Sequence, residues 1–284
     1  MARWITDTEQ GAGALLARVM VNRLWQHHFG RGIVSTSSDF GRLGTEPSHP
    51  ELLDWLASKL IDSGWRLKPI HRLIMNSAAY KQATGVEMAQ ARRDAHNEYL
   101  WHRRALRMEA EVIRDHMLSV SGALLNDLYG PSIPIGNRKK PFKDTPDTWR
   151  RSIYLMSPRF SVHPVLKVFD LPDNSQSIGV RGVSTTPSGA AFALNAPFVW
   201  EQAKRFAQRV REDAGDDLVA QVELAYTIAL SRPPTVEERK LGLSFLRQPL
   251  AGAESQAARV LDAPSPLVQY CHAVMSLNEF IYVH

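Results

Sequence analysis

Cysteine is nearly absent from this 284-residue sequence, in which Cys271 is the only one. A single thiol forms no intrachain disulfide. It also excludes zinc sites built on several thiolates and haem attachment through a C-x-x-C-H motif. Because Cys271 lies among apolar residues, we expect it to be a buried structural cysteine.

Long apolar runs are also missing. No stretch approaches the roughly 20 residues that cross a bilayer, so we expect no membrane span. The first residues, MARWITDTEQ, contain neither an apolar core nor the layout of a signal peptide. Taken literally, these two absences place the chain in the cytoplasm.

Several motifs of catalysis and nucleotide binding do not occur either. The sequence has no G-x-S-x-G elbow, no dinucleotide fingerprint and no H-E-x-x-H pair. The glycine-flanked segment Gly130–Gly136 lacks the G-K-[ST] ending of a phosphate loop. Sequence motifs alone therefore assign no reaction.

Positive charge is in small excess, since 34 Lys and Arg stand against 29 Asp and Glu, a net charge of +5. Acidic residues interrupt both basic groups, so nucleic acid is not an expected partner. The aromatic residues beside these groups suit carbohydrate stacking or core packing, and both interpretations stay open. The basic groups are Arg92, Arg93, Arg103, Arg104 and Arg107, and then Arg138, Lys139, Lys140, Lys143, Arg150 and Arg151.

What the sequence has in abundance is helical periodicity. Apolar residues at helical spacing predict helices over residues 14–29, 69–80 and 108–125. Another helix is expected to begin at Ser48, where Ser48 and Glu51 form a capping-box pattern, and to end near Gly64.

Residues 127–190 differ, because eight of the 17 prolines fall there and long helices are unfavourable. The apolar residues of this segment favour order over disorder. Residues 152–156 are compatible with a short strand, and residues 165–169 with a second strand or one helical turn.

Helical patterns return in the last third. They predict helices over 190–211, interrupted at Pro197, then over 218–231 and 266–283. A capping box of Thr235 and Glu238 starts a helix to about Arg247, and residues 250–262 form an Ala/Gly/Ser connector. The expected fold is mainly α with a Pro/Gly-rich irregular middle that holds at most one or two short strands. We expect one domain over 1–284, with helical parts at 14–126 and 191–284 around an insert at 127–190.

Histidines of the first three helices are the first candidates for a site. Metal binding needs several ligands in fixed geometry. Glu46-x-x-His49 has a di-iron spacing, but Pro47 keeps it outside a helix and it occurs once. We therefore expect no metal and no cofactor, while a metal-dependent or other hydrolase using these histidines with Asp39 remains the alternative hypothesis.

Polar residues within apolar stretches, such as Asn22, are expected to organise tertiary contacts through hydrogen bonds. With the histidines they complete a set of candidate binding residues. The set is His27, His28, Asp39, His49, His71, Arg151 and Asn195.

A family resemblance runs along nearly the whole chain. The segments that carry it are Ala17–Ile33, Ser38–Gly41, Pro47–Leu56, Ser63–Trp65, His71–Met75, Ser77–Tyr80, Arg103–Arg104, Glu111–Asp115, Arg151–Leu155, Phe169–Asp170, Asn195–Val199, Arg232–Glu238 and Asn278–Val283. Together they resemble the domain of unknown function 1553, a C-terminal domain of large planctomycete proteins that often contain an upstream planctomycete-type cytochrome c domain.

The resemblance implies a place in a larger exported protein with a companion domain upstream, but it supplies no function and transfers no catalytic residue. Our own expectation is a non-catalytic binding or scaffolding domain, linked to polysaccharide handling or electron transfer, with the companion domain or carbohydrate as partner. This sequence departs from the family's plan because it has no signal peptide, haem motif or companion domain. We therefore expect a truncated or split product of a longer protein.

Overall fold

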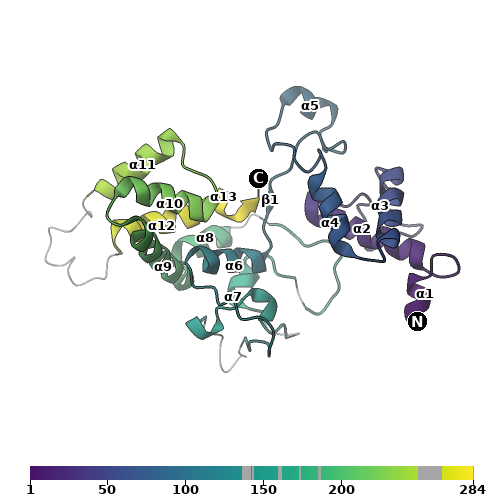
Figure 1. Ribbon diagram of the computed structural model, residues 1–284, viewed down its shortest axis with the longest axis horizontal. Coiled ribbons are helices and arrows are strands. Elements are labelled where there is room, and N and C mark those ends of the chain that lie inside the picture. Colours follow the sequence, from purple (N-terminus) through teal and green to yellow (C-terminus); the bar gives the residue numbers. More distant parts are fainter. Residues whose placement is uncertain are drawn as a thin grey trace. The chain divides into compact units, whose positions relative to one another are not determined.

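The structure, a computed structural model, describes residues 1–135, 142, 144–158, 162–172, 174–184, 187–248 and 264–283. Helices dominate it (Figure 1), which confirms the mainly α fold. The chain forms two compact units: unit 1 comprises residues 1–106 and 178–180, and unit 2 comprises residues 107–177 and 181–283. That the chain is a single family domain over 1–284 stays a prediction.

Unit 1 is built on three helices, α2, α3 and α4, with two short ones before and after them. The bounds are α1 Ala2–Thr6, α2 Gly13–Phe29, α3 Pro50–Asp62, α4 Leu67–Asn76 and α5 Met88–Arg93. Helix α2 packs against both α3 and α4, and the apolar faces that the periodicity predicts form one buried core.

Helix α2 ends at Gly30 because that residue adopts a left-handed conformation, with a φ of 79°. Its N–H donates to the Gln26 carbonyl at 2.7 Å, which closes the last turn. A side chain at this position would be strained and would meet Leu106. Glycine therefore sets the point where the chain leaves the helix.

Asn22 fastens the loop that follows α2. The side chain is fully buried; its Nδ2 donates to the Val34 carbonyl at 3.0 Å and its Oδ1 accepts the Val34 N–H at 2.8 Å. This confirms the expected structural role, because one amide satisfies both backbone groups of a buried residue.

The capping box expected at Ser48 is wrong. Helix α3 begins at Pro50 with His49 as the N-cap and no side-chain capping bond. Ser48 instead uses its N–H and hydroxyl on the Ile33 carbonyl, at 2.9 and 3.3 Å. The Ser48 hydroxyl therefore binds the loop before the helix, and this tertiary hydrogen bond forms in place of the capping bond that the local sequence predicts.

Unit 2 contains the remaining helices and the small sheet. The bounds are β1 Leu106–Arg107, α6 Ala110–Val120, η1 Pro146–Thr148, η2 Ser152–Tyr154, α7 Pro164–Val168, α8 Pro187–Asn195, α9 Pro197–Ala214, α10 Leu218–Leu230, α11 Val236–Arg247, α12 Pro266–Met275, α13 Asn278–Ile281 and β2 Tyr282–Val283, where η denotes a 3₁₀ helix. Strand β1, whose first residue Leu106 is counted with unit 1, pairs with β2.

Helices α9, α10 and α12 pack on one another and, with α6, enclose the core of unit 2 (Figure 1). The expected break at Pro197 and the capping box of Thr235 and Glu238 are both confirmed. Cys271 is fully buried in this core, as expected, and burial raises the pKa of its thiol. The last helix is shorter than expected, since α12 ends at Met275 and α13 follows a break.

The irregular middle is ordered by turns. Residues 152–154 form a 3₁₀ helix where a strand was expected, and α7 is the helical-turn alternative for residues 165–169. Two isolated bridges, Leu125 with Arg150 and Ile133 with Leu155, are the strand-like pairings described in this segment.

Some predicted features lie outside the described residues. These are Arg138, Lys139, Lys140 and Lys143 of the second basic group, and the connector 250–262. Among the helices that the structure does describe, none combines the length and the apolar character needed to cross a membrane.

Candidate functional site

A buried arginine attaches the irregular segment to α6. The Arg114 side chain is fully buried, and its guanidinium pairs with Asp144 at 3.0 Å. The same group donates to the Thr148 and Arg150 carbonyls, at 3.2 and 3.0 Å. A buried charge needs such partners, because removal from water is costly unless charge and hydrogen bonds are both matched. Residues 144–152 are thereby fixed against α6.

Asp115, the next residue on α6, holds the start of η2. Its Oδ1 accepts the N–H of Ser152 at 2.8 Å and the Ser152 hydroxyl at 2.7 Å. Burial raises the pKa of the Asp115 carboxyl, and the two bonds from Ser152 offset only part of that effect. A weakly acidic carboxyl therefore stands beside a buried serine.

Asp115 and Ser152 belong to the wall of a cavity of about 470 Å³ within unit 2. Its walls mix polar and apolar side chains from α6, η2, α7 and the turns between them. The lining residues are Glu109, Glu111, Val112, Asp115, Ile135, Arg151, Ser152, Ile153, Leu155, Met156, Ser157, Val162, His163, Leu166, Leu171 and Asn174. Cavities of this size and mixed lining are typical of small-molecule sites. We call it the α6 cavity.

Glu111 lies one turn before Asp115 on the same face of α6. Its two oxygens accept bonds from the guanidinium of Arg181, at 2.7 and 3.1 Å. The two parallel hydrogen bonds form a bidentate ion pair. The three carboxyls of the cavity therefore differ: Glu109 and Glu111 are paired with Arg181, and Asp115 is desolvated.

His163 closes one side of the α6 cavity and is 2% exposed. Its Nδ1 accepts the Val165 N–H at 3.2 Å, which caps α7. Burial and the charge of Arg114 lower its pKa to about 3, so the ring is neutral and carries its proton on Nε2. Nε2 has no hydrogen-bond partner among the described residues, and Asp144 Oδ2 lies 3.6 Å away.

In unit 1, two of the candidate histidines come together. His28 Nε2 of α2 and His71 Nδ1 of α4 are 2.8 Å apart, a hydrogen-bond distance. Burial, and then the charge of His71, lower the pKa of His28. The pair joins two helices and packs edge-on against Tyr80. Its geometry is that of a structural link.

His27 and Asp39 do not join this pair. His27 lies exposed on α2, and the Asp39 carboxylate accepts the Gly41 N–H at 2.8 Å in an exposed turn. Over the residues that the structure describes, no group of three or more His, Cys, Asp or Glu side chains is arranged to hold a metal ion.

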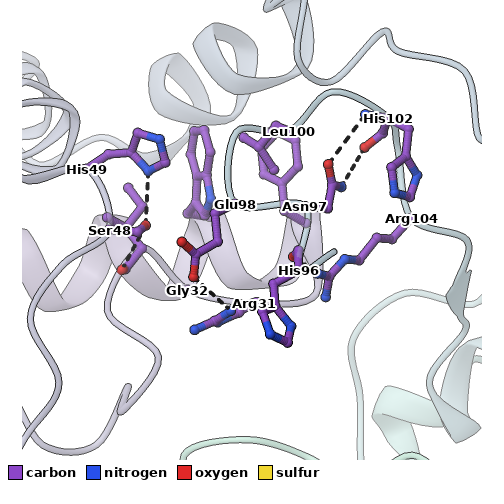
Figure 2. A pocket seen from close by; sticks show the side chains of 13 residues that line it. Arg31, Gly32, Ser48, His49, His96, Asn97, Glu98, Leu100, His102 and Arg104 are labelled. Carbon is purple, nitrogen blue, oxygen red and sulfur yellow. Dashed lines mark hydrogen bonds and ion pairs between the residues drawn. The ribbon is translucent and has the colours of Figure 1, made fainter. Parts of the chain in front are cut away.

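His49 lines a different, narrow pocket in unit 1 (Figure 2). Its Nδ1 lies 3.0 Å from the Ser48 hydroxyl, and its ring meets Tyr99 edge-on. Asn97, which is buried, makes two bonds to the His102 backbone in the opposite wall. We call this the α2–α3 loop pocket.

The two remaining candidates, Arg151 and Asn195, both lie in unit 2, but only Arg151 lines the α6 cavity. Arg151 is exposed and lines the α6 cavity, whereas Asn195 is exposed at the end of α8 and donates to the Ala191 carbonyl. Sequence reasoning missed Asp115, Ser152 and His163. The four-residue spacing of Glu111 and Asp115 opposite an apolar helix face was the available signal.

Fold and cavity together define a mainly helical, two-unit protein with a polar ligand-sized cavity in unit 2. The chain belongs to a family described as "PSD1: Protein of unknown function (DUF1553)", whose profile matches residues 1–246. No curated protein and no solved structure matches the chain.

Proposed function

We propose that the chain is a binding module that takes a hydroxyl-rich ligand of the carbohydrate class in the α6 cavity. The observation that carries the proposal is the lining of this cavity. Hydrogen-bonding groups of Asp115, Ser152 and Asn174 lie among apolar side chains such as Val112 and Leu155. Sugars present hydroxyls at the ring edge and C–H groups on the ring face, so both kinds of wall find a partner.

The electrostatics of the cavity also favour a neutral polyol. Glu109 and Glu111 both pair with Arg181, Arg151 adds a positive charge to the lining, and burial raises the pKa of Asp115. His163 is uncharged. A neutral ligand that both donates and accepts hydrogen bonds therefore suits the cavity better than a cation does.

Sequence segments support the same site. Glu111–Asp115 and Arg151–Leu155, two segments that carry the family resemblance, meet at the α6 cavity. Of the two roles expected from the sequence, polysaccharide handling and electron transfer, the cavity bears on the first. A place within a larger exported protein, beside a companion domain, rests on the resemblance alone.

A glycan array followed by calorimetry tests the proposal. We expect retention of a defined set of oligosaccharides, and a three- to tenfold weaker affinity for Asn174→Ala, because one hydrogen bond is lost. Asn195→Ala, which alters an exposed amide outside the cavity, is the matched control. A folded protein that retains no glycan would refute the carbohydrate assignment.

The hydrolase alternative stays a hypothesis with its own test. Purified protein containing stoichiometric metal, which is lost in His28→Ala or His49→Ala, would support it. Metal-free protein that shows no hydrolysis when metal is added would remove it.

A further inference from the structure

The α2–α3 loop pocket of unit 1 has a chemistry unlike that of the α6 cavity. Two guanidinium groups, of Arg31 and Arg104, line it against a single carboxylate, that of Glu98. Three histidines, His49, His96 and His102, complete the polar wall. Among the side chains that line the pocket, two guanidinium groups therefore face one carboxylate. A second carboxylate, that of Asp94, does not line the pocket but interacts electrostatically with Arg104 and His96.

Buried residues give this pocket a fixed frame. Trp25, Phe29 and Ile33 form an apolar floor, each less than a tenth exposed. The opposite wall is a turn held by Asp94, whose carboxylate accepts the N–H groups of Glu98 and Tyr99, both at 2.9 Å.

Both arginines reach the same turn. Arg104 donates to the His96 carbonyl, and Arg31 lies 3.8 Å from a Glu98 oxygen (Figure 2). The Arg31–Glu98 pair is loose, and both side chains are 49% exposed. Exposed pairs of this kind contribute little to stability, so another anion can take the place of Glu98 at small cost.

Size restricts what enters. The pocket encloses about 40 Å³, room for about three water molecules. A tetrahedral oxyanion fits this scale, whereas a sugar ring or a nucleobase does not. Planar guanidinium groups bind such oxyanions through paired hydrogen bonds.

We propose that the α2–α3 loop pocket binds a small oxyanion, sulfate or phosphate, between Arg31 and Arg104, with Glu98 as an internal competitor. The oxyanion is either the free ion or the terminal group of an ester whose remainder stays outside. This site is independent of the α6 cavity and of the carbohydrate proposal.

The test titrates the ¹⁵N-labelled 284-residue protein with sodium sulfate and with inorganic phosphate at constant ionic strength, and sodium chloride is the reference. We expect saturable amide shifts confined to residues 31–33, 48–49 and 96–104. Arg31→Gln should weaken binding at least fivefold, and Glu98→Gln should strengthen it. Arg92→Gln, on α5 and outside the pocket, is the matched control and should leave binding unchanged.

The opposite signs expected for Arg31→Gln and Glu98→Gln separate ligand binding from a structural role. Changes of the same sign in both variants, or shifts that follow total salt without saturating, would overturn the proposal. Methyl phosphate distinguishes the two sources, because binding equal to that of phosphate indicates an ester-linked group and weaker binding a free ion. Absence of binding by all three anions would also overturn it.

Discussion

The two units solve the same problem with different chemistry. Each must hold a proline-containing segment that has no α-helix against a helix: unit 1 uses the neutral amide of Asn22, and unit 2 uses the charged guanidinium of Arg114. Both side chains are fully buried. The amide serves one residue, Val34, whereas the guanidinium reaches the carboxylate of Asp144 and two carbonyls.

The difference shows how the reach of a side chain limits what it can organise. Two complementary hydrogen bonds suffice for a short loop. Residues 144–152 present a carboxylate and two carbonyls at separate points, and a guanidinium with five donors in a fixed plane reaches all three. We therefore expect that removing Arg114 lowers the unfolding free energy more than removing Asn22 does.

The largest effect is expected for Arg114→Met. This change leaves Asp144, whose side chain is 11% exposed, without its guanidinium partner and leaves two carbonyls without donors. Unit 2 should lose about 3–5 kcal/mol of unfolding free energy, measured by urea denaturation. Arg211→Gln, at an exposed position in a loose ion pair, is the control and should change little.

Asn22→Leu is expected to rank second. The change leaves the N–H and the carbonyl of Val34 buried without partners, at a cost of about 2–3 kcal/mol in unit 1. Hydrogen exchange of the Val34 amide should accelerate, while amides of α9 and α12 keep their protection. A loss of protection in unit 2 as large as that in unit 1 would contradict the separation of the two anchors.

A pair of glycine variants sharpens the comparison within unit 1. Gly30→Ala should lose about 1–2 kcal/mol, because its φ is positive and the new methyl group meets Leu106. Gly64 has a similar φ of 67°, but no atom lies within 4 Å of the position that a new Cβ would take. Gly64→Ala therefore costs only the backbone strain of a positive φ. Thermal denaturation of both should show the larger loss for Gly30→Ala; equal losses would remove the role given to Leu106.

The smallest change in stability is expected when the pH is lowered. Hydrogen bonds from Ser184, with the charge of Arg107, lower the pKa of Asp170 to about 2, and Arg232 does the same for Glu238. Because the folded state prefers these carboxyls ionised, their stabilisation is present above their ordinary pKa values near 4. It is lost as the pH falls towards 2.

Thermal denaturation between pH 5 and pH 2 should therefore show that the stability of unit 2 falls with pH. Glu238→Gln should reduce this fall in unfolding free energy by about 1 kcal/mol or less. The Asn22 anchor of unit 1 does not titrate. An unchanged pH profile in the Glu238→Gln variant would show that this carboxyl does not take part.

Prediction from the sequence succeeds where a pattern is local. The spacing of apolar residues predicts α2 and α10 closely, and the Thr235–Glu238 capping box starts α11 as expected. It fails at Ser48, whose hydroxyl binds the Ile33 carbonyl, a residue 15 positions away. The Ile33 carbonyl, which takes the Ser48 hydroxyl away from the helix, is too distant in sequence for a local pattern to include it.

The candidate site follows the same rule. Arg151 belongs to a basic cluster that is visible in the sequence, and His28 and His71 were named as candidates without their contact being predicted. Ser152 and His163 acquire their environment only when the irregular segment folds back on α6, and their immediate neighbours in sequence carry no sign of it. The pairing of Asp115 with Ser152 spans 37 positions.

The burial of Cys271 has a practical consequence. Because this thiol is inside the core of unit 2 and is the only one in the chain, a thiol reagent reaches it only when that core opens. The rate of labelling in the unmodified protein would therefore time the opening of unit 2. A second cysteine placed on the surface of unit 1 would react first. A fluorophore could therefore be attached selectively to either unit.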